Sequence, residues 1–271
     1  MGKVGLITVH GMGETKRGYA DKLFEELQDR LDADSWSNVI TGTVYYQHII
    51  QHNQEGYLAR TRDKLDWQKL RKFMLYGFSD ASSLESYKKG KDSPYYLSQL
   101  EILNSLQAIY RTAGSAIPVI VVAQSLGGQV ITNYLWDATQ DSSDLSAGIW
   151  KKPPNLGEDE EKFCRGRNIV RLFTTGCNIP LFLAGRGRDQ IKPIDPSNFG
   201  EGFQWHNYYD EDDVLGWPLR ELSDEYARLV QDHKIDSGGV FTSPTPLSHT
   251  RYWTDRDFVK PLAATLKGFM S

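Results

Sequence analysis

The chain has 271 residues, which is long enough for one large α/β domain or two small ones, each with a buried core. Its 31 basic and 35 acidic residues give a formal net charge of −4, and the two signs are interspersed. This balance gives no reason to expect nucleic acid or an anionic membrane as a partner. The two cysteines, Cys164 and Cys177, fit neither a disulfide framework nor a metal site, and we expect buried or bystander thiols in a reducing compartment.

The first residues already have the pattern of a core strand, without the long apolar region and cleavage site of a secretory leader. No apolar stretch approaches the length that a membrane-spanning helix requires. We therefore expect a cytoplasmic protein without stable membrane insertion.

Strand-like and helix-like segments alternate along the chain. Apolar runs rich in β-branched or aromatic residues predict strands at residues 4–9, 39–46, 118–124, 169–175 and 203–209. Helical periodicity covers residues 16–31, 94–113, 129–136 and 255–267. The alternation predicts an α/β fold with a doubly wound, mainly parallel sheet, in which ligands bind beyond the carboxyl ends of the strands.

Three segments fall outside this simple alternation. Residues 48–92 are charged and aromatic, and we interpret them as a helical cap insertion over the site, the alternative being a surface excursion unrelated to substrate. Residues 137–167 contain two consecutive prolines and an acidic run, and they predict a solvated surface connection. Residues 185–202, rich in Gly, Arg and Asp, are a candidate wall of the pocket. Without repeats or a low-complexity linker, residues 1–271 are expected to form a single domain.

The most informative motif is AQSLG at residues 123–127, which follows a continuously apolar strand and precedes a helical pattern. This is the layout of a nucleophile elbow, a sharp strand-to-helix turn that lifts a serine hydroxyl above the end of a buried strand. The turn brings the residues two before and two after the serine close together, and Ala123 and Gly127 are both small. Ser125 is therefore the candidate nucleophile, the alternative being a strand followed by an ordinary glycine-rich helix start.

The segment VHGMGE at residues 9–14 follows the first strand. Acyl transfer requires two backbone N–H groups aimed at the developing oxyanion. We expect one from Leu126, which follows the nucleophile, and the other from Met12, with Gly11 as the next candidate. His10 is then expected to hold the loop in place. A phosphate-binding glycine loop is the rival interpretation, but the segment lacks the G-x-G-x-x-G spacing.

A serine hydroxyl needs a base that removes its proton, and in this type of fold the order along the chain is serine, acid, histidine. Of the histidines after Ser125, His206 lies within a strand pattern and His233 follows a charged helical stretch. His249 lies in a loop before the last helix and is the candidate base. The acidic loop after residue 209 offers the orienting carboxylate, for which we choose Asp213, with Asp212 as the alternative.

Taken together, these motifs resemble the α/β-hydrolase superfamily, and more narrowly its lipase- and esterase-like branch of uncharacterised serine hydrolases. The resemblance rests on the loop at residues 9–14, the elbow at 123–127, WHNYYDEDD at 205–213 and SHTRYW at 248–253. Alanine replaces the more usual first glycine of the elbow, and the usual first two strands are absent. The resemblance therefore implies a shortened fold of about six strands, with no cofactor and no metal.

The function expected is that of a serine hydrolase that cleaves a small-molecule carboxylic ester, or less readily a thioester or amide, through an acyl-enzyme on Ser125. Asp213 and His249 complete the expected catalytic triad, and Met12 and Leu126 the expected oxyanion hole. The alternatives are a hydrolase-like binding module without turnover and an acyltransferase that uses the same triad. The sequence does not name the substrate or the oligomeric state.

Overall fold

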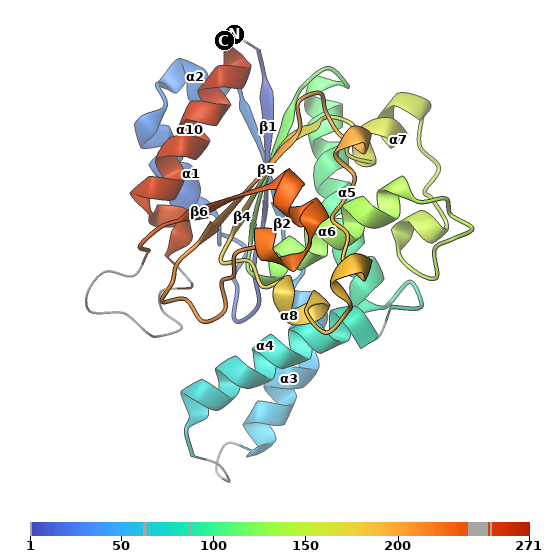
Figure 1. Ribbon diagram of the computed structural model, residues 1–271, viewed down its shortest axis with the longest axis vertical. Helices are drawn as coiled ribbons and strands as arrows, with labels where there is room; N and C mark the ends of the chain where they lie inside the picture. The colour runs from blue at the N-terminus through green and yellow to red at the C-terminus, as the bar shows by residue number, and fades with distance from the viewer. Residues whose placement is uncertain (1, 62–63, 65, 87, 238–248, 250) are drawn as a thin grey trace.

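The computed structural model describes residues 2–61, 64, 66–86, 88–237, 249 and 251–271, and a parallel sheet lies at its centre (Figure 1). The strands lie in the order β2-β1-β3-β4-β5-β6, and every neighbouring pair is parallel. Their bounds are Val4–Val9 (β1), Val39–Val44 (β2), Val119–Gln124 (β3), Ile169–Thr175 (β4), Gln204–Tyr209 (β5) and Val230–Lys234 (β6). The expected α/β fold with a parallel sheet of about six strands is confirmed.

The central strand β3 is apolar on both sides because both of its faces are covered. Val119, Val121 and Ala123 belong to one hydrophobic cluster, and Ile120 and Val122 belong to the cluster on the opposite face. All five side chains are fully buried. This is the burial pattern that continuous apolar strands of parallel sheets require.

Helices cover both faces of the sheet (Figure 1). One face carries α1 (Asp21–Arg30), α2 (Ala33–Ser37) and α10 (Arg256–Met270), while the other carries α5 (Pro94–Ala113), α6 (Leu126–Thr139) and α7 (Glu158–Cys164). Two short helices, α8 (Pro180–Leu183) and α9 (Asp224–Leu229), lie in the connections after β4 and before β6. Short 3₁₀ turns occur at Ile149–Lys151, Arg188–Gln190, Pro196–Asn198, Arg220–Leu222 and Tyr252–Thr254.

Local sequence signals explain several helix ends. Ser93 caps α5 by accepting a hydrogen bond from the Tyr96 N–H, Pro94 occupies the first turn, and Gly114 ends the helix at a φ of 77°. The expected helix at residues 16–31 begins later, at Asp21. The reason lies in Tyr19, whose hydroxyl is drawn inward to the carbonyl oxygens at the ends of β1 and β2, at 2.7 and 3.0 Å.

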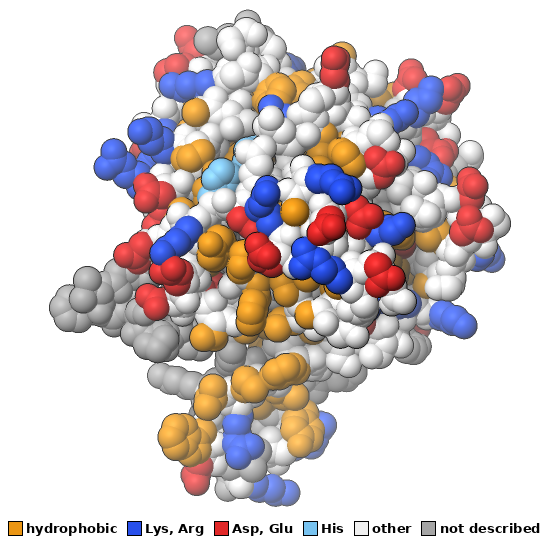
Figure 2. All heavy atoms as spheres, in the orientation of Figure 1, with side chains coloured by type: hydrophobic (Ala, Val, Ile, Leu, Met, Phe, Trp, Pro, Cys, Tyr) orange, Lys and Arg blue, Asp and Glu red, His pale blue; other side chains and the backbone are white. Residues whose placement is uncertain are grey.

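The insertion at residues 48–92 forms two helices, α3 (Gln47–Thr61) and α4 (Gln68–Ser86), which project from the carboxyl-terminal end of the sheet (Figure 1). Figure 2 shows apolar side chains gathered on this projection. Trp67, Leu70 and Phe78 are more than half exposed there, whereas Tyr76 and Leu84 are buried. The apolar residues of the insertion that the structure describes therefore include both buried and exposed side chains.

The segment at residues 137–167, expected to be a solvated connection, contributes to the core. Trp150 and Phe163 are each 1% exposed and pack in the cluster beneath α5 and α6. Its acidic run begins α7, and the prolines before it lie at the surface. Among the described helices, none combines the length and the apolar character needed to cross a bilayer.

Candidate active site

Ser125 lies in the sharp turn between β3 and α6. Its backbone has φ 52° and ψ −124°, a region that residues other than glycine rarely adopt and that a fold maintains only where surrounding contacts enforce it. The Ser125 N–H donates to the Thr175 carbonyl oxygen at 2.9 Å, and the Ser125 carbonyl accepts from the Gly128 N–H at 3.0 Å. The turn thus holds the serine from both sides.

Two glycines allow this turn to pack against its neighbours. A methyl group at Gly127 would lie 2.5 Å from the carbonyl oxygen of His10 and 2.6 Å from that of Val9. One at Gly128 would lie 2.7 Å from the Cys177 sulfur. The small residue expected at position 127 is therefore required by the backbone at the end of β1. The close approach at Gly128 was not predicted from the sequence pattern.

The loop after β1 lies directly against the nucleophile, since a methyl group at Gly11 would lie 2.7 Å from the Cβ of Ser125. His10 organises this loop. Its Nε2 accepts a hydrogen bond from the Tyr46 N–H at 3.1 Å, which leaves the proton on Nδ1 to donate to the Gly11 carbonyl at 2.7 Å. Burial lowers the pKa of His10 to about 4 against the opposing effect of that last hydrogen bond, so the ring is neutral and structural.

Helix α4 supports the same loop from the outside. The sulfur of Met12 lies close to Gly77, and the Gly13 N–H donates to the Asp80 carboxylate at 3.4 Å. Asp80 is 1% exposed and also accepts from the side-chain amides of Gln54 at 2.7 Å and Gln47 at 3.4 Å. Burial raises the pKa of Asp80 to about 6, even though these hydrogen bonds favour its ionised form. The pattern of apolar and aromatic residues in the insertion gave no sign of this buried acid.

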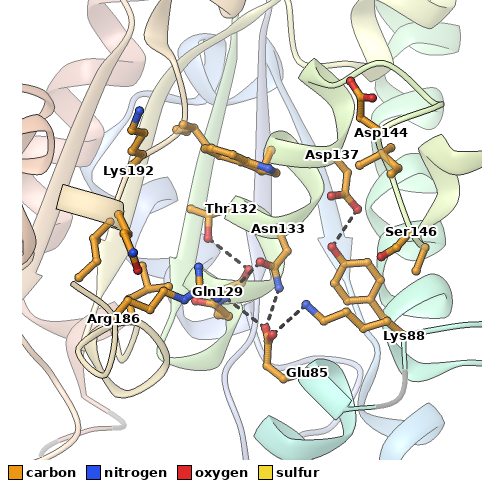
Figure 3. Close-up of a pocket in the computed structure, with 18 of the residues that line it drawn as sticks. Glu85, Lys88, Gln129, Thr132, Asn133, Asp137, Asp144, Ser146, Arg186 and Lys192 are labelled. Atoms are coloured by element: carbon orange, nitrogen blue, oxygen red, sulfur yellow. Dashed lines mark hydrogen bonds and ion pairs between the residues drawn. The ribbon is translucent and has the colours of Figure 1, made fainter. Parts of the chain in front are cut away.

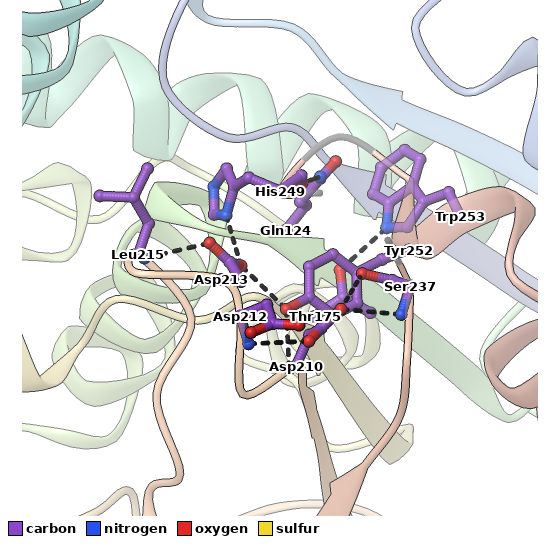
Figure 4. Close-up of polar contacts among 10 residues, drawn as sticks. All are labelled: Gln124, Thr175, Asp210, Asp212, Asp213, Leu215, Ser237, His249, Tyr252 and Trp253. Carbon is purple, nitrogen blue, oxygen red and sulfur yellow. Dashed lines mark hydrogen bonds and ion pairs between the residues drawn. The ribbon is translucent and has the colours of Figure 1, made fainter. Parts of the chain in front are cut away.

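Asp213 and His249 meet at the carboxyl-terminal edge of the sheet (Figure 4). The distance from His249 Nδ1 to Asp213 Oδ2 is 2.8 Å. The Tyr252 hydroxyl donates to the same oxygen at 2.8 Å, and the Leu215 N–H donates to Oδ1 at 3.0 Å. Burial alone would raise the pKa of Asp213, but the hydrogen bond and charge of His249, with the other two donors, outweigh burial and lower it. The carboxylate therefore stays ionised beside the imidazole.

Of the other acids in this loop, none replaces Asp213 at the imidazole. Asp212 has an exposed side chain, and its N–H donates to Asp210 Oδ1 at 2.9 Å. Asp210 accepts from the N–H and hydroxyl of Ser237, and Glu211 forms an ion pair with Lys234. The loop thus divides its acids between one that faces the histidine and others that hold the surrounding chain.

His249 is joined to the elbow through its backbone, because the side-chain amide of Gln124 donates to its carbonyl oxygen. Within the described residues, neither the Ser125 hydroxyl nor His249 Nε2 has a hydrogen-bond partner. The two residues are 1% and 5% exposed. Catalytic hydrogen bonds in ligand-free proteins are often long and shorten only when substrate binds. The serine–histidine bond is therefore the one contact of the expected triad that this structure does not contain.

The other late histidines occupy a different place. His206 on β5 and His233 on β6 contact each other through ring nitrogens 3.0 Å apart. Both lie in the strands themselves, before the loops that carry Asp213 and His249.

Tyr252 is the residue of this region that sequence reasoning missed, although it belongs to the motif at 248–253. Its hydroxyl accepts from the Asp210 N–H at 3.0 Å while donating to Asp213.

Met12 and Leu126, the expected sources of the oxyanion N–H groups, lie on the two segments that flank Ser125. Met12 follows Gly11 in the loop that touches the serine, and Leu126 is the first residue of α6. In the described part of the chain, no group of three or more His, Cys, Asp or Glu residues is arranged to hold a metal ion.

No family model and no curated protein matches the chain. Solved structures that are similar include the catalytic core of an acetyl xylan esterase from Trichoderma reesei, with a TM-score of 0.45, 9% identity and 97% of each chain covered. Esterase B from Lactobacillus rhamnosis, in complex with an inhibitor, has a TM-score of 0.46 and 11% identity over 99% of this chain and 78% of that one. A hydrolase described as a member of the alpha/beta superfamily, from Xanthomonas campestris pv. campestris, has a TM-score of 0.40 and 12% identity over 97% of this chain and 99% of that chain. At these levels of similarity, the function rests on the chain's own side chains.

Proposed function

We propose that the protein is a serine hydrolase that cleaves a carboxylic ester, with Ser125 as the nucleophile. The observation that carries this proposal is the buried hydrogen bond between His249 Nδ1 and Asp213, at the edge of the sheet where Ser125 occupies a strained turn. A carboxylate on Nδ1 fixes the imidazole tautomer, so that Nε2 is left to accept the serine proton. Strained backbone at a buried serine is typical of a site that function has maintained.

In the first half of the reaction, His249 Nε2 removes the Ser125 proton while Oγ forms a bond to the ester carbonyl carbon. The N–H groups of Met12 and Leu126 donate to the oxyanion of the resulting tetrahedral intermediate. The C–O bond to the alcohol then breaks, and the protonated His249 donates its proton to the leaving oxygen. An acyl-enzyme on Ser125 remains.

In the second half, His249 removes a proton from water, and the hydroxide oxygen attacks the acyl carbon. The bond to Ser125 Oγ breaks as the imidazolium returns its proton, which releases the acid and regenerates the serine. Asp213 remains ionised throughout and stabilises the imidazolium charge. Because Ser125 is 1% exposed, the substrate carbonyl reaches Oγ only after neighbouring side chains move aside.

The test is the rate of p-nitrophenyl ester hydrolysis, measured over a series of acyl chain lengths. Ser125→Ala should lower kcat by roughly 10⁴-fold or more without unfolding the protein. Asp213→Asn should also lower it steeply, because an amide cannot hold the required tautomer. Asp212→Asn, which makes the same chemical change on an exposed neighbour, should leave the rate unchanged.

A folded Ser125→Ala variant with full activity would remove the proposal. An inactive wild-type protein across the ester series, with intact folding, would favour a binding module instead. Addition of alcohols would distinguish hydrolysis from acyl transfer, since a transferase would form a new ester at the expense of the free acid.

A further inference from the structure

A cavity lies beside α6 (Figure 3). It has a volume of about 480 Å³, is partly open to solvent, and is lined by residues of α6, the end of α4, residues 144–147 and residues 183–194. Neither Ser125 nor Asp213 nor His249 lines it. We call it the α6 pocket; its volume is within the roughly 300–1,000 Å³ of small-molecule sites.

The floor of the α6 pocket contains an unused hydrogen-bond acceptor. Gln129, Asn133 and Trp136 line it from one face of α6. The Gln129 amide nitrogen donates to Glu85 at 3.3 Å and to the Asn133 oxygen at 3.1 Å. Because a carboxylate can only accept, Glu85 fixes which end of the Gln129 amide faces it.

The other end of that amide, Gln129 Oε1, is buried and has no partner within the described residues, and the residue as a whole is 6% exposed. A buried carbonyl oxygen without a donor is unfavourable. Because the oxygen itself is buried, a hydroxyl or N–H group of a ligand reaches it only after the Gln129 side chain turns toward the cavity.

The charges of the pocket are separated between its walls. Arg186 and Lys192, from the segment at 183–194, are exposed, and neither forms an ion pair with a described carboxylate. Lys88, in contrast, is paired with Glu85 at 2.8 Å. In Figure 3 the two unpaired cations lie on one side, and Asp144 lies on the other. One wall thus attracts an anionic group, and the opposite wall accepts hydrogen bonds.

Trp136 adds an apolar surface to this polar site, since the residue is 41% exposed and lines the same cavity. A flat aromatic ring next to amides and carboxylates suits a ligand that has C–H groups on one face and hydroxyl groups at its edges. A sugar ring has this distribution.

We propose that the α6 pocket binds a hydroxylated anion of sugar size, a sugar acid or a sugar phosphate. Its acidic group lies between Arg186 and Lys192, one hydroxyl donates to Gln129 Oε1, and the C–H face of the ring packs on Trp136. Guanidinium and ammonium groups form charge-assisted hydrogen bonds with carboxylate and phosphate alike. This site does not depend on the proposed esterase activity.

The test is isothermal titration of the full-length protein with glucuronate, glucose 6-phosphate and neutral glucose. Binding of either anion, with glucose weaker by about tenfold or more, is expected, and the tighter anion identifies the acidic group. The surface variant Arg186→Gln/Lys192→Gln should weaken the anion about tenfold or more. The control Lys3→Gln/Lys22→Gln makes the same charge change at two exposed lysines, and there affinity should be unchanged.

Gln129→Leu should weaken the anion and glucose alike, because it removes the acceptor for a hydroxyl rather than a charge. The proposal is overturned if neither anion binds at about 10 mM, if glucose binds as tightly as the anions, or if the two double variants have the same affinity. Ser125→Ala should bind the anion as the wild type does, so that loss of esterase activity and loss of this site remain distinguishable.

Discussion

The carboxyl group of Asp80 couples α4 to the loop beside Ser125, and its ionisation gives a quantitative test of that contact. Asp80 is 1% exposed, and burial raises its pKa from 3.8 to about 6. A raised pKa in the folded protein means that the ionised form is disfavoured by folding. The stability that this group contributes is therefore complete below about pH 4 and is lost as the pH rises through about 6.

The size of the effect follows from the two pKa values. At about 1.4 kcal/mol per pH unit, the difference between 3.8 and about 6 corresponds to roughly 3 kcal/mol. Asp80→Asn keeps the shape and a carbonyl acceptor but cannot ionise. Gln47 and Gln54 each have a buried amide oxygen without a partner among the described residues, so an amide at position 80 can find an acceptor. The free energy of unfolding of the variant should thus rise relative to wild type by roughly 2 kcal/mol between about pH 4 and pH 8.

Urea denaturation of both proteins at a series of pH values measures this difference directly. Asp212→Asn, on an exposed acid, serves as the control and should show no comparable trend. A difference between Asp80→Asn and wild type that stays constant from pH 4 to pH 8 would refute the reasoning.

Gly127→Ala should lower the free energy of unfolding by about 2 kcal/mol, because the clash with two backbone carbonyls outweighs a gain in helix propensity of about 1 kcal/mol. The control Gly268→Ala, in open space on α10, should instead raise the free energy of unfolding by up to about 1 kcal/mol. Equal effects of the two substitutions in urea denaturation would contradict this explanation. Tyr252→Phe should lower kcat about tenfold or more, since the Asp213 carboxylate loses a donor, and an unchanged turnover would show that the hydroxyl is dispensable. Both cysteines are buried, and burial raises their pKa values to about 12. A thiol reagent should therefore modify them only after the protein unfolds. Rapid labelling of the native protein would contradict the core packing.

The sequence predicted those parts of the fold whose residues meet a strict local requirement. Strand β3 had to be continuously apolar because both of its faces are covered, and Gly127 had to be small because a backbone lies against it. Ser93, Pro94 and Gly114 fixed the ends of α5 by capping chemistry alone. Requirements of this kind depend on neighbours in the chain or on one adjacent strand.

Other elements escaped prediction because distant contacts decide them. Strand β6 has the sequence VQDHK at the sheet edge, where only Val230 is fully buried, so it shows no apolar pattern. The start of α1 is set by Tyr19 reaching carbonyl groups on two strands. Likewise, the Tyr252 hydroxyl donates to a carboxylate 39 residues earlier in the chain, a contact that no local pattern reveals.

The central claim is that Ser125 is an activated nucleophile, and covalent labelling with a fluorophosphonate tests it most directly. The wild-type protein should acquire one adduct, located on Ser125 by peptide mapping, and His249→Ala should label far more slowly while remaining folded. A native wild-type protein that stays unlabelled, or whose adduct lies on another residue, would contradict the account.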